Sequence, residues 1–480
     1  MKAAAAAATL WLLATMAMGG LVPAPAFALC LVLLARLWRD SGGKPFARHP
    51  DAALGLTLLA VYLSTFRWHG GDDAPNSLLP FCLLRHGTLT LEPVLDPWFT
   101  GTPGKVDNFT VLHLGKHLSV FPVAPALLAL PVYLVTALSG ASITEPALHG
   151  LSKLSASLIT ALSAVALRRA LKGRCSDEFA LALCFVYGLG TWAFSVSSQA
   201  LWQHGPSALG AGLALWGFNG RGFRSDALAG FGLGLATAAR PDSVFFAAAG
   251  AAYVLLFDRK RLPGFALGAA IPAGLLFAYW FAYTGRLIPP ESETHQRIFG
   301  AFQPAAFFGL IASPTRGLLF YFPPAVFGIF AAWRSKDALT RLMTAACAGP
   351  WLLLCFFHVW VGGGTFGPRY FAVVALVLCW AMAGLEPWLA ASAARARLWA
   401  VSAAAAMLVH AAGGYLLWPG TEHHATQKAT LWFWSLHPLA NVLTPEGALR
   451  SLPFPVRALI FAAALAAAWR AVKLLERAPR

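Results

Sequence analysis

Charged residues are scarce in this chain of 480 residues: Asp, Glu, Lys and Arg make up 12% of the sequence, roughly half of their share in an average soluble domain. Hydrophobic residues make up 58%, and the mean hydropathy is +0.63. This balance excludes a water-soluble fold. Apolar runs long enough to span a bilayer recur along the whole sequence, which predicts an all-α protein that crosses a membrane many times.

The sequence also lacks the motifs of several function classes. Its seven cysteines include no CxxC pair and fall mostly inside apolar runs, so neither a disulfide framework nor a zinc site is indicated. No Gly-rich nucleotide loop and no internal repeat is evident, so energy for a reaction would come from the substrate or from a gradient. The positions of the basic residues matter more than the net charge of +16, because they can orient the helices in a membrane; no nucleic-acid partner is expected.

Basic residues predict the orientation of the helices, because short loops rich in Lys and Arg face the cytoplasm. This rule places both termini inside and predicts about 14 transmembrane helices. The predicted spans lie at 3–18, 21–37, 51–67, 146–167, 177–197, 205–219, 226–239, 243–257, 264–283, 317–333, 342–360, 370–390, 398–418 and 455–472.

One further apolar run, residues 120–138, contains three prolines that obstruct a continuous helix. Counting this run as a crossing would invert every later basic loop, so we interpret it as interfacial or re-entrant. The first 28 residues also resemble a signal peptide, but cleavage after Ala28 would leave a segment too short to span. The expected parts of the chain are an N-terminal hairpin with a cytoplasmic loop (1–50), a core with a long outer loop at 68–145 (51–390) and C-terminal helices with an outer loop at 419–454 (391–480).

The outer loops hold most of the polar residues that could carry chemistry. Asp72 and Asp73 lie at the water boundary and could act as a general base or as ligands, or Asp73 could simply cap the helix that follows. His204, after Gln203, occupies the outer end of one predicted helical hairpin. Arg240 and Asp242 occupy another such turn, where they would face a polar cavity or pair with each other at an interface.

Three basic residues are candidate phosphate clamps. Arg316 in SPTRG and Arg369 in GGGTFGPRY lie at outer helix ends beside glycines, and the guanidinium fork matches phosphate oxygens. Lys116 in LGKHLS carries the same charge just before the proline-rich run. The alternative is that they anchor the protein at the membrane interface, where Trp360 and Tyr370 would join them.

Taken in order, these segments resemble the membrane-embedded GT-C superfamily of glycosyltransferases, especially bacterial relatives of protein O-mannosyltransferases and lipid A aminoarabinose transferases. The resemblance covers residues 51–370. It departs from the family in the extra N-terminal hairpin and in the lack of a large soluble domain after the last helix. It rests on these strings: GDDAPNSLLPFCLLRHGTLTLE, GKHLSVFPVAPALLALPVYL, SKLSASLITALSAVALRRAL, WQHGP, ARPDS, SPTRGLLFYFPP and GGGTFGPRY.

The resemblance implies a GT-C-like bundle whose first outer loop contains juxtamembrane helices and an acid that serves as catalytic base or positions the acceptor. Asp72 matches this acid best, with Asp73 as its neighbour or substitute, while basic residues would bind the donor's lipid-linked phosphate. The implied reaction transfers a sugar from a polyprenyl phosphate to an envelope glycan, lipid or protein, with inversion and without a cofactor. The second acid stays open among Asp96, Asp107, Asp242 and Glu291.

A metal requirement is left open, although adjacent Glu422, His423 and His424 do not by themselves form a coordination shell. Two rival functions also remain. A lipid-linked-sugar flippase or secondary transporter would have a similar number of spans, and a non-catalytic scaffold would tolerate loss of Asp72. The Ala- and Arg-rich composition suggests a bacterial inner membrane, with the site facing the periplasm or cell exterior.

Overall fold

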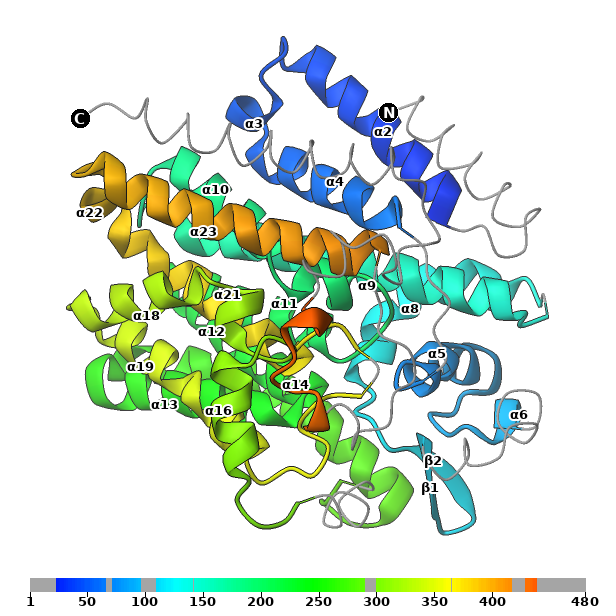
Figure 1. The fold of residues 1–480 in the computed structure, drawn as a ribbon. Coiled ribbons are helices and arrows are strands. Elements are labelled where there is room, and N and C mark those ends of the chain that lie inside the picture. Colours follow the sequence, from blue (N-terminus) through cyan, green and yellow to red (C-terminus); the bar gives the residue numbers. More distant parts are fainter. Residues whose placement is uncertain are drawn as a thin grey trace.

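The chain folds into a mostly helical body, shown in Figure 1 as a computed structural model. Together with its apolar helices, this makes it a multi-pass membrane protein. The structure describes residues 23–65, 71–95, 109–140, 142–289, 299–363, 365–416 and 428–437.

Four helices pack one against the next: α9 (Glu145–Leu171), α11 (His204–Asn219), α12 (Phe223–Ala239) and α14 (Leu262–Thr284). Helix α11 packs against α9 and α12, and α12 packs against α14. Glycines allow these backbones to approach closely. A Cβ atom at Gly210 of α11 would lie 2.5 Å from the backbone nitrogen of Ala236, and one at Gly268 of α14 would lie 1.9 Å from the carbonyl oxygen of Ala227.

The remaining helices lie on both sides of this row, and α21 (Ala372–Ala381) is buried along its whole length (Figure 1). On the N-terminal side are α2 (Pro23–Asp40), α3 (Pro45–Arg48), α4 (Pro50–Leu63), α10 (Asp177–Leu189) and the π-helical turn Ala193–Ser197. In the second half are α13 (Val244–Phe257), α16 (Pro304–Ala312), α17 (Leu318–Tyr321), α18 (Ala325–Arg334), α19 (Ala338–Ala346), α20 (Ala348–Leu354), α21 (Ala372–Ala381), α22 (Glu386–Ala390) and α23 (Ala393–Ala411). Single turns lie at Pro241–Ser243, Arg259–Arg261, Arg369–Phe371, Met382–Leu385, Ala412–Leu416 and Trp434–Leu436.

Within the described residues, four helical stretches are long and apolar enough to cross a membrane: Glu145–Leu171, Arg259–Thr284, Arg369–Ala390 and Ala393–Tyr415. Several other predicted spans are shorter or interrupted. The span expected at 317–333 is divided between α17 and α18, where Pro323 and Pro324 supply no backbone N–H groups. The predicted number of about 14 is therefore not confirmed, and the spans expected at 3–18 and 455–472 lie outside the described residues.

The described part of the segment predicted to be the first outer loop includes α5 (Ala74–His86), α6 (Glu92–Leu95), β1 (Thr110–His113), β2 (Lys116–Ser119) and α8 (Ala124–Leu138). The antiparallel hairpin is a local exception within the predicted all-α fold, which is mostly helical. Its two-residue turn, Leu114 and Gly115, has φ angles of 49° and 76°, which match the twist of paired strands. Leucine is uncommon in that conformation, so the sequence carried little signal for the turn.

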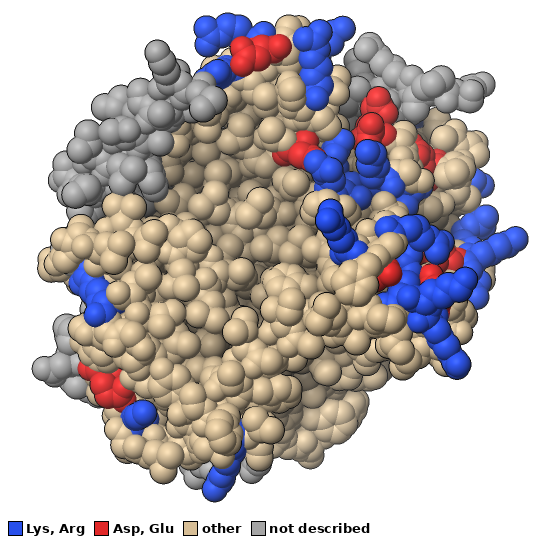
Figure 2. Space-filling view, turned by 180° about the vertical axis from the view of Figure 1, so that it is seen from behind, with Lys and Arg blue, Asp and Glu red and all other residues tan. Residues whose placement is uncertain are grey.

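Ion pairs join helix ends that the charge rule assigns to the cytoplasm. Arg168 of α9 contacts Asp51 of α4 at 2.5 Å, and Arg261 contacts Asp226 of α12 at 3.1 Å. Figure 2 shows charged side chains concentrated along part of the margin of one face, next to a broad surface that carries few. Helix α14 exposes Leu275 by 61% of its area, as expected for a helix that faces lipid.

Candidate active site

Asp72 lies in the turn that leads into α5, where the chain leaves the apolar helix α4. Its carboxylate accepts a hydrogen bond from Nη2 of Arg369 at 2.5 Å, across 297 residues of sequence. The Asp72 side chain is 38% exposed, whereas that of Arg369 is only 11% exposed. The carboxylate can thus be reached from solvent, while the guanidinium lies mostly inside the protein.

Arg369 begins the single helical turn that precedes α21. Its guanidinium carbon lies 5.9 Å from the ring centre of Trp202 and 5.6 Å from that of Tyr370, within the range of cation–π attraction. Its Nε atom is buried and has no hydrogen-bond partner among the described residues. Arg369 therefore presents a positive charge that Asp72 satisfies through one of its nitrogens.

Arg240 ends α12 and forms a two-point ion pair with Asp242 in the following turn. Nε and Nη2 of Arg240 each lie 2.7 Å from a different oxygen of Asp242. The third nitrogen, Nη1, contacts the imidazole of His204 at the start of α11. Because an arginine only donates, the imidazole nitrogen that faces it accepts and carries no proton.

Tyr370 joins these two groups into one cluster. The guanidinium of Arg240 lies 5.0 Å from the tyrosine ring centre, that of Arg369 lies 5.6 Å away, and the ring of His204 lies 6.3 Å away edge-on. The structure thus brings together Asp72, His204, Arg240, Asp242 and Arg369, all of which were nominated from the sequence. The cluster combines an accessible carboxylate with two guanidinium groups and a histidine.

Arg316 and Lys116 occupy other positions. Arg316 is buried and donates to the carbonyl oxygens of Thr365 at 2.8 Å, Gly363 at 3.2 Å and Gly367 at 3.3 Å. These carbonyls belong to the loop that carries Arg369, so Arg316 supports that loop. Lys116 lies on the β-hairpin with its ammonium 5.3 Å from the ring centre of Tyr283. Their direct role in binding phosphate remains a prediction.

Asp73 is buried behind Asp72 and is only 2% exposed. It stands at the N-cap position of α5 but makes no capping hydrogen bond with its side chain, in contrast to the capping alternative. Instead, Oδ2 accepts a hydrogen bond from Ser152 of α9 at 3.4 Å. Burial, reinforced by the charge of Asp72, raises the pKa of Asp73 to about 7. Asp73 can therefore change its protonation state near neutral pH.

Ser152 and Lys153, in the SKLSASL segment of α9, were not predicted as site residues from the sequence. Lys153 is 1% exposed, and its ammonium donates to Thr65 at 3.1 Å and to Gln199 at 3.0 Å. Ser152 also accepts from the backbone N–H of Leu201, which fixes its hydroxyl toward Asp73. A lysine within an otherwise apolar helix is a signal that could have identified this region.

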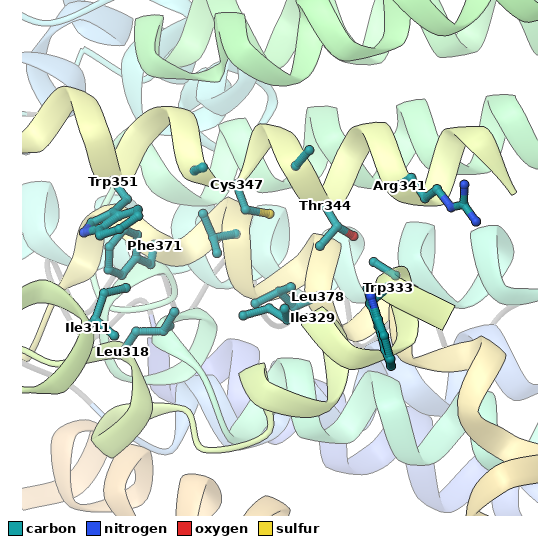
Figure 3. A pocket seen from close by; sticks show the side chains of 14 residues that line it. Ile311, Leu318, Ile329, Trp333, Arg341, Thr344, Cys347, Trp351, Phe371 and Leu378 are labelled. Atoms are coloured by element: carbon teal, nitrogen blue, oxygen red, sulfur yellow. The ribbon is translucent and has the colours of Figure 1, made fainter. Parts of the chain in front are cut away.

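An apolar pocket of about 740 Å³ is lined by residues of α16, α17, α18, α19, α20 and α21. Figure 3 shows Ile311, Leu318, Trp351 and Phe371 at one end of it and Arg341 at the other. Phe371 is two residues from Arg369, so this end of the pocket adjoins the turn that carries the buried arginine. The pocket has the lining of a site for a hydrocarbon chain.

No group of three His, Cys, Asp or Glu side chains that could hold a metal ion occurs within the described part of the chain. The adjacent Glu422, His423 and His424 lie outside the described residues. So do three of the acids considered for a second role: Asp96, Asp107 and Glu291. The fourth, Asp242, is the partner of Arg240.

No protein-family model and no curated protein matches this chain. Similar solved structures include the apo oligosaccharyltransferase of Archaeoglobus fulgidus, at 12% identity and a TM-score of 0.49, covering 85% of this chain and 61% of that one. The oligosaccharyltransferase AglB from the same organism, in complex with an inhibitory peptide and a dolichol-phosphate, has 13% identity and a TM-score of 0.44, covering 85% of this chain and 60% of that one. Arabinosyltransferase EmbB from Mycobacterium smegmatis has 13% identity and a TM-score of 0.43, covering 95% and 44%.

This chain thus spans about three fifths or less of the length of these structures. At these TM-scores the similarity carries no argument about this chain, and function has to be argued from the site. The enzymes in these structures are an oligosaccharyltransferase and an arabinosyltransferase.

Proposed function

We propose that the protein is a GT-C-type membrane glycosyltransferase that moves a sugar from a polyprenyl phosphate to an acceptor on the outer face of a bacterial inner membrane. The observation that carries the proposal is the contact between Asp72 and Arg369. It joins a half-exposed carboxylate to a cluster of basic and aromatic side chains at the outer end of the helices. A carboxylate beside cationic groups is the minimum required for this chemistry.

In the proposed reaction, the acceptor hydroxyl oxygen attacks C1 of the donor sugar, and its proton passes to Asp72. The bond between C1 and the phosphate oxygen breaks, and its electron pair stays on that oxygen. Attack from the side opposite the phosphate inverts the configuration at C1. A positioned base of this kind contributes about 10² to 10⁴ in rate.

The leaving polyprenyl phosphate gains one negative charge as the bond breaks. Arg369 is placed to stabilise that charge, because its guanidinium is mostly buried and its fork of donors matches phosphate oxygens. Arg240 and His204 add positive and polar character across the ring of Tyr370. The apolar pocket that ends at Phe371 would accept part of the isoprenoid chain.

The experiment that tests the proposal uses the purified protein in vesicles with radiolabelled polyprenyl-phosphate sugars and a crude envelope extract as acceptor. We expect transfer of label to the extract, reduced at least tenfold in Arg369→Gln. Glu145→Gln, which alters an exposed carboxylate at the start of α9, is the matched control and is expected to keep wild-type transfer. Movement of labelled lipid across the bilayer without any transfer would instead identify a flippase.

A further inference from the structure

In the proposed reaction, Asp72 acts on the acceptor and Arg369 acts on the donor, yet in this structure the two side chains contact each other. The base must receive the acceptor proton, and the arginine must contact the donor phosphate. Yet Oδ2 of Asp72 lies 2.5 Å from Nη2 of Arg369. While this pair is closed, the carboxylate occupies the position on the guanidinium that a phosphate oxygen would take.

The two arginines of the cluster differ in how their charges are satisfied. Arg240 contacts both oxygens of Asp242 and also His204, so each of its three nitrogens has a partner. Arg369 contacts one oxygen of Asp72 through one nitrogen, and its buried Nε has no hydrogen-bond partner among the described residues. Arg369 is therefore the guanidinium that gains most from an incoming anion with several oxygens.

Of the two carboxylates that pair with these arginines, Asp72 is the one with room to move. The side chain of Asp242 is 13% exposed, whereas that of Asp72 is 38% exposed, so a released Asp72 carboxylate can be hydrated. Arg369 itself is held by contacts with Trp202 and Tyr370 that do not involve Asp72. An anion could thus replace Asp72 without displacing the arginine.

We propose that Asp72 is a stand-in for the donor's phosphate: in the resting protein it fills the anion site on Arg369, and an isoprenyl phosphate takes its place. This inference rests on the proposed function and adds an order to it. The donor binds first, and its phosphate releases the Asp72 carboxylate toward the acceptor. The base is then free only when a sugar is in position to be transferred.

Such competition predicts that removing a site residue strengthens ligand binding, whereas removal of a site residue usually weakens it. A ligand that must displace an internal group binds with an apparent affinity lowered by the fraction of protein in which the site is free. Removing the Asp72 carboxylate removes the competitor. A variant that loses the proposed base should therefore bind the isoprenyl phosphate more tightly, by about tenfold for a partly exposed ion pair.

The experiment measures the affinity of farnesyl phosphate by titration calorimetry on the full-length protein in lipid nanodiscs, with farnesol as the control for the hydrocarbon chain. Asp72→Asn and Asp72→Ala are both tested, because alanine leaves no amide that could itself bind phosphate. Asp73→Asn at pH 8.5 is the matched control, since it removes a neighbouring carboxylate that does not contact Arg369. Size-exclusion profiles and melting temperatures confirm that each variant is folded.

We expect tighter binding in both Asp72 variants, unchanged binding in Asp73→Asn and no dependence of farnesol binding on any of them. If wild type binds farnesyl phosphate and the Asp72 variants bind it equally or more weakly, the proposed replacement of Asp72 by phosphate is wrong. The proposal of a lipid-phosphate donor would be unaffected by that result. An equal gain in Asp73→Asn would also overturn it, because general charge repulsion would then explain the effect. Absence of binding to wild type and variants alike would overturn the proposed donor as well.

Discussion

Arg316 provides a test that separates two roles for a buried cation. The sequence suggested a phosphate clamp, whereas the structure shows Arg316 donating to three carbonyl oxygens of the loop that carries Arg369. At about 1.5 kcal/mol each, the low end for charged donors, three such hydrogen bonds contribute about 4 to 5 kcal/mol to the position of this loop. Most of this stabilisation depends on the planar fork of N–H donors in the guanidinium rather than on its charge.

The comparison that exploits this difference is Arg316→Lys against Arg316→Gln. Lysine keeps the charge but presents it from a single nitrogen, so we expect it to retain about one of the three hydrogen bonds. A loss of about 3 kcal/mol corresponds to roughly a hundredfold shift away from the ordered loop. Both variants should therefore lower sugar transfer at least tenfold and weaken farnesyl phosphate binding to a similar degree.

The assay is label transfer from a polyprenyl-phosphate sugar, combined with the melting temperature of each variant in the same lipid. The reasoning would be refuted if Arg316→Lys transferred sugar at close to the wild-type rate while Arg316→Gln was inactive. Arg316 would then act through its charge, as the sequence suggested, and its contacts with the loop would be incidental.

Three further predictions concern the surroundings of the cluster. Gly367→Ala should reduce transfer at least tenfold, because the residue has φ +61° and a Cβ there would lie 2.4 Å from the ring of Tyr321; wild-type transfer would contradict this. The raised pKa of Asp73 means that the folded state binds more protons than the unfolded state between pH 4 and 7, so the melting temperature should fall as pH rises through this range. The full shift corresponds to about 4 kcal/mol, and Asp73→Asn should flatten the profile, whereas an unchanged slope in that variant would assign it to other groups. Tyr370→Phe should keep farnesyl phosphate binding within about threefold and Tyr370→Leu should weaken it about tenfold, since the ring contacts both guanidinium groups; equal effects would exclude the ring as the cause.

The sequence identified the residues of the cluster better than their arrangement. Polar side chains at the outer ends of apolar helices are few, and Asp72, His204, Arg240, Asp242 and Arg369 could be nominated for that reason alone. Their pairing could not, because the contact between Asp72 and Arg369 closes over 297 residues and depends on how α5 and α21 are placed. Proximity along the chain did predict one pair, Arg240 with Asp242.

Other features depended on local conformation that composition does not reveal. The turn of the β-hairpin contains Leu114 in a left-handed conformation. Hydropathy alone does not distinguish the two strands of this hairpin from loop. The predicted number of spans is not confirmed by the long helices in the described residues, since apolar runs such as 317–333 are divided at proline. Asp73 looked like a helix cap because of its position, but its side chain turns toward Ser152 instead.

The most direct test of the account is the turnover of Asp72→Asn in the vesicle assay for sugar transfer, at saturating donor. The side chain of Asp72 is 38% exposed, and asparagine keeps a side-chain oxygen that can accept from Arg369, so we expect the variant to fold. We predict that the variant folds and binds donor but transfers sugar about 10² to 10⁴ times more slowly than wild type, while Glu145→Gln is unaffected. Turnover at the wild-type rate in Asp72→Asn would contradict the central claim that this carboxylate is the base.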